Sequence, residues 1–141
     1  MISEWALAIE PFAEAYRWAL RAAAAFLIGL AAMTMVFPAR ARAFLAGQAS
    51  TLCLNTLEGA LRLVAGVALI GFAARTGLPA WLTLAGLFLA VTAVAMVLLP
   101  GLHRRYAQWA VPFALKILPV YAAGAFALGV ALVWMTALPD I

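Results

Sequence analysis

The order of apolar and polar positions divides the chain into long apolar runs separated by short polar or basic stretches. A helix needs roughly 20 apolar residues to cross a bilayer, and four runs approach that length, over residues 20–37, 60–75, 80–99 and 118–138. Pro38 and Pro100 stand at the ends of the first and third runs, where a proline stops a helix. The pattern predicts an all-α fold in which residues 1–141 form a single integral membrane domain, a four-helix transmembrane bundle.

The pattern also repeats. A shift that brings Phe26 onto Phe88 aligns Pro38 with Pro100, so an apolar helix, a proline stop and a basic connection recur in the same order. We therefore expect two helical hairpins in parallel orientation, each of which brings its basic connection to the same face.

The connection after the third run has the period of an amphipathic helix. Its large apolar side chains fall at i, i+4, i+7 and i+11, and they are Leu102, Tyr106, Trp109 and Phe113. This spacing predicts an interfacial helix that lies on the membrane surface until Pro112 disturbs it. Residues 43–57, in the first connection, are less clearly patterned and too polar for the middle of a bilayer.

Composition supports a membrane protein. Hydrophobic side chains make up 69% of the 141 residues and charged ones 10%, and the mean hydropathy is +1.11. A soluble domain carries about a quarter charged residues. The net charge is +4, but the basic side chains flank apolar runs instead of forming a water-facing patch, which excludes nucleic acid as a partner. We expect membrane lipids as neighbours.

Charge and aromatic side chains predict the orientation. The side chains expected at the headgroups of one membrane face are Arg40, Arg42, His103, Arg104, Arg105 and Lys116. The positive-inside rule assigns this face to the cytoplasm and both termini to the outer, periplasmic side. The aromatic residues expected at the two interfaces are Trp18, Trp81, Tyr106, Trp109 and Trp134.

The main candidate site is formed by Asn55, Glu58 and Arg62, whose spacings of three and four place them on one helix face. Charged groups inside a bilayer mark functional sites, since burying an unpaired charge costs several kcal/mol. If the second span begins near Ala60, however, Glu58 lies among the headgroups and Arg62 can reach it as an i,i+4 pair worth a few tenths of a kcal/mol. Structural pairing and ligand binding both remain open.

A second charged stripe, Glu10, Glu14, Arg17 and Arg21, runs along the start of the first helix. It is either the solvated end of a helix or a surface that contacts a partner or lines an outer vestibule.

The sequence offers little for catalysis. Cys53 is the one cysteine and His103 the one histidine, which excludes an internal disulfide, a thiol redox pair and bis-histidine haem within the chain. No catalytic triad, phosphate-binding glycine loop or paired intramembrane carboxylates occur. We expect no catalytic residues, no metal site and no cofactor.

Several segments carry a family resemblance: Leu61–Gly66 opens a span, Gly77–Pro79 precedes the next, and Pro100–Trp109 forms a basic connection before a last span rich in Ala and Gly. This arrangement resembles a group of small uncharacterised bacterial four-helix inner-membrane proteins, from the first span to the last. The resemblance implies a fold and the bacterial inner membrane, but no activity. An arginine commonly opens the second span in that group, which Arg62 matches, whereas Glu58 is not part of the pattern.

A second resemblance is narrower. The membrane-associated eicosanoid and glutathione metabolism proteins are four-helix chains of this length, and their second helix carries an Asn-x-x-Glu pair that Asn55 and Glu58 match in spacing. The arginine expected shortly before that Asn is absent, and Ser50 and Thr51 stand in the neighbourhood. This resemblance implies a membrane-bound glutathione-dependent enzyme.

Three functional hypotheses follow. The leading one is a non-enzymatic accessory or structural subunit of a larger inner-membrane complex, packed against other integral membrane subunits through small residues such as Gly86 and Ala90. The alternative is a small transporter or lipid-binding protein that uses Glu58 and Arg62, for which a homo-oligomer could enclose the path. The remote one is the glutathione-dependent enzyme.

Overall fold

A computed structural model describes residues 10–47 and 50–137. In these ranges it contains a short 3-10 helix, η1 (Glu10–Phe12), six α-helices and no strand. Four helices are long and apolar enough to span a membrane, namely α2 (Ala13–Val36), α4 (Leu52–Thr76), α5 (Ala80–Leu98) and α7 (Leu118–Ala137). Two shorter helices, α3 (Pro38–Gly47) and α6 (Pro100–Lys116), connect them. The predicted all-α, four-span fold of a multi-pass membrane protein is confirmed.

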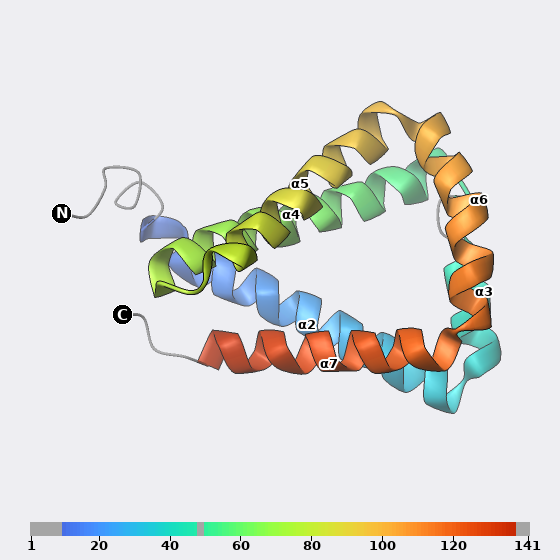
Figure 1. The fold of residues 1–141 in the computed structure, drawn as a ribbon, viewed down its shortest axis with the longest axis horizontal. Coiled ribbons are helices and arrows are strands. Elements are labelled where there is room, and N and C mark those ends of the chain that lie inside the picture. The colour runs from blue at the N-terminus through green and yellow to red at the C-terminus, as the bar shows by residue number, and fades with distance from the viewer. Residues whose placement is uncertain (1–9, 48–49, 138–141) are drawn as a thin grey trace.

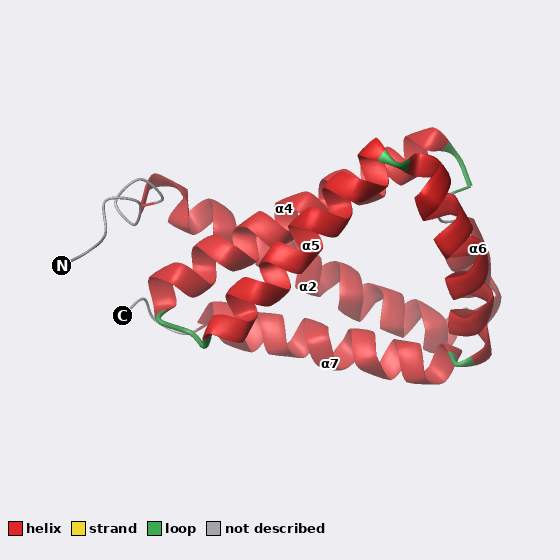
Figure 2. Cartoon of the chain, turned by 45° about the horizontal axis from the view of Figure 1, so that its top comes forward, coloured by secondary structure: helices red, strands yellow, loops and turns green. Residues whose placement is uncertain are grey.

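The long helices form two arms that make a V (Figures 1 and 2). One arm is the antiparallel pair α4 and α5, and the other is the pair α2 and α7. The arms meet at the narrow end, where α2 begins and α7 ends, mainly through contacts between α2 and α4. They diverge toward the wide end, which α3 and α6 cross side by side.

The connections explain the V. Gly77 ends α4 in the left-handed conformation at φ 60°, and α5 begins directly after Pro79, so this tight reversal keeps α4 and α5 together. The 17 residues of α6 correspond to about 25 Å, and the 10 of α3 to about 15 Å, at 1.5 Å per residue. These helices act as spacers. The long–short–long order occurs twice, as the repeat predicted, but each span packs most closely on a span of the other repeat.

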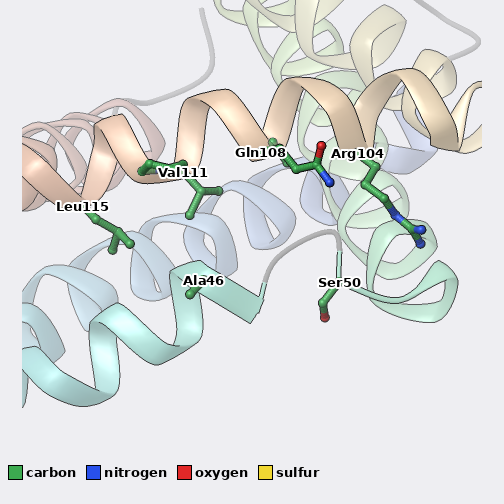
Figure 3. Close-up of a pocket in the computed structure, with 8 residues that line it drawn as sticks. Ala46, Ser50, Arg104, Gln108, Val111 and Leu115 are labelled. Carbon is green, nitrogen blue, oxygen red and sulfur yellow. The ribbon is translucent and has the colours of Figure 1, made fainter.

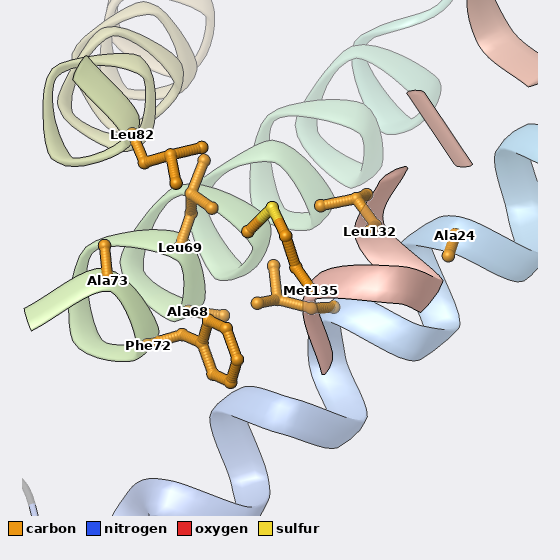
Figure 4. Packing of buried hydrophobic residues seen from close by; sticks show 9 residues of the cluster. Ala24, Ala68, Leu69, Phe72, Ala73, Leu82, Leu132 and Met135 are labelled. Atoms are coloured by element: carbon orange, nitrogen blue, oxygen red, sulfur yellow. The ribbon is translucent and has the colours of Figure 1, made fainter. Parts of the chain in front are cut away.

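A hydrophobic cluster joins the arms near the narrow end (Figure 4). Leu69 and Phe72 of α4 lie there with Leu132 and Met135 of α7, and Leu20 of α2 is 2% exposed in the same cluster. Burial of side chains of this size is worth about 1.5–3 kcal/mol each relative to water. In a bilayer the gain comes from close packing instead, because lipid tails are also apolar.

Glycines allow the helices within an arm to approach closely. A Cβ atom on Gly66 would lie 2.7 Å from the carbonyl oxygen of Gly86, and one on Gly129 would lie 3.1 Å from that of Ala24. Gly86 and Ala90, the small residues singled out in the sequence, both face Gly66. The contact between α4 and α5 is therefore a backbone-to-backbone crossing.

Three boundaries differ from the sequence prediction. Helix α2 begins at Ala13, ahead of the span predicted from residue 20. Helix α4 begins at Leu52, ahead of the span predicted from near Ala60, because the Thr51 hydroxyl accepts a hydrogen bond from the Leu54 amide at 3.2 Å and caps the helix. Helix α6 continues through Pro112 to its end. Since Pro112 is exposed, the carbonyl group that loses its partner there can be solvated.

Candidate functional site

Glu58 and Arg62 lie in the first half of α4, toward the wide end of the V. They continue the stripe of α4 that contains Leu69 and Phe72, since these four residues fall at i, i+4, i+11 and i+14. Leu69 and Phe72 contact the other arm in the core. The same stripe therefore presents apolar side chains at the narrow end of the V and two charged side chains toward the wide end.

The two charges are paired within helix α4. Arg62 Nη2 donates to Glu58 Oε1 at 2.7 Å, and the side chains are 43% and 19% exposed. Gly59 lies against Ala93 of α5, which ends at Leu98. Glu58 is thus about one helical turn, ~5 Å, inside the end of α5, and Arg62 a further turn deeper.

Two more polar side chains approach the pair from other helices. His103 of α6 and Tyr121 of α7 both interact electrostatically with Glu58 and Arg62. Tyr121 lies on the stripe of α7 that contains Leu132, so it faces the other arm. Partial burial lowers the pKa of His103 below its ordinary 6.5; Glu58 opposes this shift and Arg62 adds to it. Polar groups of α4, α6 and α7 thus gather between the arms.

Asn55 does not belong to this group. It is 3% exposed, and its Nδ2 donates to the Met96 carbonyl of α5 at 2.8 Å. Its Oδ1 is buried without a hydrogen-bond partner. Asn55, Glu58 and Arg62 share one face of α4, as their spacing predicts. Gly59 lets α5 approach closely there, and Asn55 bonds the backbone of α5 whereas Glu58 bonds Arg62.

The charged stripe at the start of the first span joins α2 to α7. Arg17 Nη1 and Arg21 Nη2 donate to the Thr136 carbonyl at 3.2 and 3.3 Å, and Arg17 lies 4.0 Å from Glu14. Cations are favourable at the C-terminal end of a helix such as α7. The side chain of Glu10 lies outside the described part. Arg17 and Arg21 thus attach the start of α2 to the end of α7.

The basic wide end is exposed. Arg40 and Arg42 of α3 and Arg104, Arg105 and Lys116 of α6 are all exposed, and His103 is half-buried. The interfacial aromatics, each 60–70% exposed, are Trp18, Trp81 and Trp134 near the narrow end and Tyr106 and Trp109 on α6. The Trp109 and Phe113 rings stack at 6.4 Å, which extends the apolar stripe of α6.

A hollow of about 440 Å³ separates α3 from α6 at the same end. Arg104, Gln108 and Leu115 leave α6 on the side that faces α3, and Ala46 and Ser50 line the opposite wall (Figure 3). This hollow is open and mixed in character. Arg104, which the sequence places among the headgroup residues, lines this hollow. The hollow itself was not predicted from the sequence.

Fold and site together define the class: a multi-pass membrane protein of four helices with a polar cluster between its arms. Within the described ranges, no group of three His, Cys, Asp or Glu side chains could hold a metal ion. No family model, curated protein or solved structure matches the chain. The resemblance to small bacterial inner-membrane proteins therefore stays a prediction.

Proposed function

We propose that this protein is a non-enzymatic membrane protein that binds an amphipathic molecule between its arms. The polar part of the ligand contacts Glu58 and Arg62, and its apolar part contacts exposed apolar side chains of the spans. The observation that supports this proposal is the ion pair of Glu58 and Arg62 on α4, with a Glu58 side chain that is 19% exposed. His103 of α6 and Tyr121 of α7 interact electrostatically with the same pair.

The chemistry of the cluster suggests the kind of headgroup. Glu58 accepts hydrogen bonds and Arg62 has five N–H donors, of which one bonds Glu58. The pair is neutral overall, so the empty site carries no uncompensated charge in a medium of low dielectric constant. A headgroup with both donors and acceptors fits this set better than a strongly charged one.

Native mass spectrometry of the full chain, extracted from membranes in mild detergent, tests this proposal. The wild type should retain a lipid-soluble molecule that Glu58→Gln/Arg62→Gln loses at least tenfold. A matched control, Glu14→Gln/Arg105→Gln, removes one acid and one base outside the site and should retain it. Equal retention by both variants, or no bound molecule in the wild type, would contradict the proposal.

A second candidate is the accessory subunit of a larger complex in the bacterial inner membrane. It is favoured by the open V, because large apolar side chains are exposed along all four spans, among them Phe26, Leu61, Phe88 and Leu128. A helix of another subunit could pack against such surfaces. Native gels of mild detergent extracts should then show a particle much larger than the chain. Migration as a monomer or small homo-oligomer would argue against it.

A further inference from the structure

A second hollow, of about 570 Å³, lies between α2 and α7. Its walls come from these two helices and from the start of α3, with none from α4 or α5. Small side chains create the space, since Ala31 and Ala32 line one wall and Ala122 and Ala123 the other. It is therefore separate from the Glu58 and Arg62 cluster and faces away from α4.

The length of this hollow matches one membrane leaflet. Along α2 it runs from Ile28 to the start of α3 at Pro38, which is about 15 Å at 1.5 Å per residue. That is half of the ~30 Å thickness of the hydrocarbon core. Along α7 it runs from Leu118 to Phe126, about 12 Å. An extended acyl chain of the leaflet at the wide end has this reach.

The polar groups of the hollow are confined to its wide end. The Thr34 hydroxyl already donates to the Leu30 carbonyl at 2.9 Å. Arg42 lies at the mouth, exposed, and its Nη1 donates to the Leu115 carbonyl at 3.2 Å. That bond ties the guanidinium to α6 and leaves its other N–H groups available. No acidic side chain lines the described walls.

We propose that this hollow holds one acyl chain of an anionic phospholipid, with the headgroup phosphate against Arg42. An apolar hollow as long as one leaflet, with the guanidinium of Arg42 at its end, is complementary to a hydrocarbon chain joined to a phosphate. A second copy of the chain is a poorer occupant, because a two-fold contact over this hollow would bring the two Arg42 side chains toward each other. This inference does not depend on the proposed ligand between the arms.

Native mass spectrometry of the detergent-solubilised full chain, titrated with phosphatidylglycerol and with phosphatidylcholine of the same acyl chains, provides the test. Phosphatidylglycerol should bind more tightly, and Arg42→Gln should weaken it about fivefold, the effect of one basic residue near an anionic surface. Arg40→Gln is the matched control. Arg40 lies on the same helix but stacks on Phe37 at 5.0 Å and does not line the hollow, so this variant should bind like the wild type.

A second variant separates the chain from the headgroup. Ala32→Phe fills the hollow and should weaken both phospholipids to the same extent, whereas Arg42→Gln should weaken phosphatidylglycerol more than phosphatidylcholine, whose choline group compensates the phosphate charge. Equal affinities for the two lipids, or equal effects of Arg40→Gln and Arg42→Gln, would overturn the assignment. It would also be overturned by a lipid-free dimer that Ala32→Phe abolishes, because the hollow would then hold a second copy.

Discussion

At the scale of single residues, the hydrogen-bond partner decides what each polar side chain of α4 does. Asn55 and Glu58 are neighbours on the helix, yet Asn55 bonds the backbone of α5 while Glu58 bonds Arg62. The buried Oδ1 of Asn55 has no partner, which costs about 1–3 kcal/mol unless a water or another donor reaches it. The charge of Glu58 is compensated by Arg62. The first residue therefore joins two helices, and the second is available to a ligand.

The crossing of α4 and α5 should not tolerate a methyl group. A Cβ on Gly86 would lie 2.7 Å from the Gly66 carbonyl oxygen and 2.8 Å from Ile70 Cγ1. The carbonyl belongs to the helix backbone, so the helices must separate, and we expect Gly86→Ala to destabilise the protein by about 1–3 kcal/mol. Thermal unfolding in detergent measures this. Gly124→Ala is the control, since nothing lies within 4 Å of its Cβ position; an equal loss there would contradict the close crossing.

His103 should make stability depend on pH. Its pKa is lowered in the folded protein, first by partial burial, so below pH 6.5 the unfolded chain binds the proton more readily. Stability is then unaffected by this group above pH 6.5 and is lost as the pH falls from there through the folded pKa. We expect the melting temperature to fall between pH 7 and pH 5, and His103→Gln to reduce that fall. An unchanged pH dependence in the variant would show that other groups cause it.

At the scale of elements, the sequence predicts the spans well and their beginnings less well. The third and fourth spans agree with α5 and α7 to within a residue or so, because proline and glycine mark their ends. The second begins earlier, since a helix begins where its first amides are capped and not where the side chains become apolar. Thr51 was the available signal. The interaction of His103 and Tyr121 with Glu58 could not be predicted, because it depends on how the two arms are oriented relative to each other.

The cap of α4 can be tested directly. Thr51→Ala removes the acceptor of the Leu54 amide, and the loss of an N-cap costs about 1 kcal/mol. Thermal unfolding should show this loss, and hydrogen exchange should become faster over the first turn of α4. Ser50→Ala, one residue earlier, removes a hydroxyl for which no capping bond is seen and should have little effect. Similar losses in both variants would mean that the helix does not depend on Thr51.

At the scale of the whole molecule, the two spacer helices determine what the bundle can do. Four spans joined by short loops would pack into a closed bundle with little room inside. Here α6 and α3 hold the arms apart at the wide end, while the hydrophobic cluster and the contact of Arg17 with the Phe72 ring hold them together at the narrow end. The charged pair of α4 lies toward the wide end of the V. In the function proposed above, a lipid-soluble ligand would reach this pair from the bilayer.

The same shape makes the orientation in the membrane testable with one native thiol. Cys53 is exposed at the wide end, and Glu14 is exposed at the narrow end with a side chain 74% accessible. The wide end carries more Arg and Lys, so the positive-inside rule directs it to the cytoplasm.

A membrane-impermeant maleimide added to intact bacterial cells whose outer membrane is permeabilised should label Glu14→Cys in a Cys53→Ser background and leave the wild type unlabelled. After disruption of the inner membrane both should react, which controls for thiol access. Labelling of the wild type in intact cells would reverse the orientation, and labelling of both proteins there would mean that the two ends are not separated by the membrane.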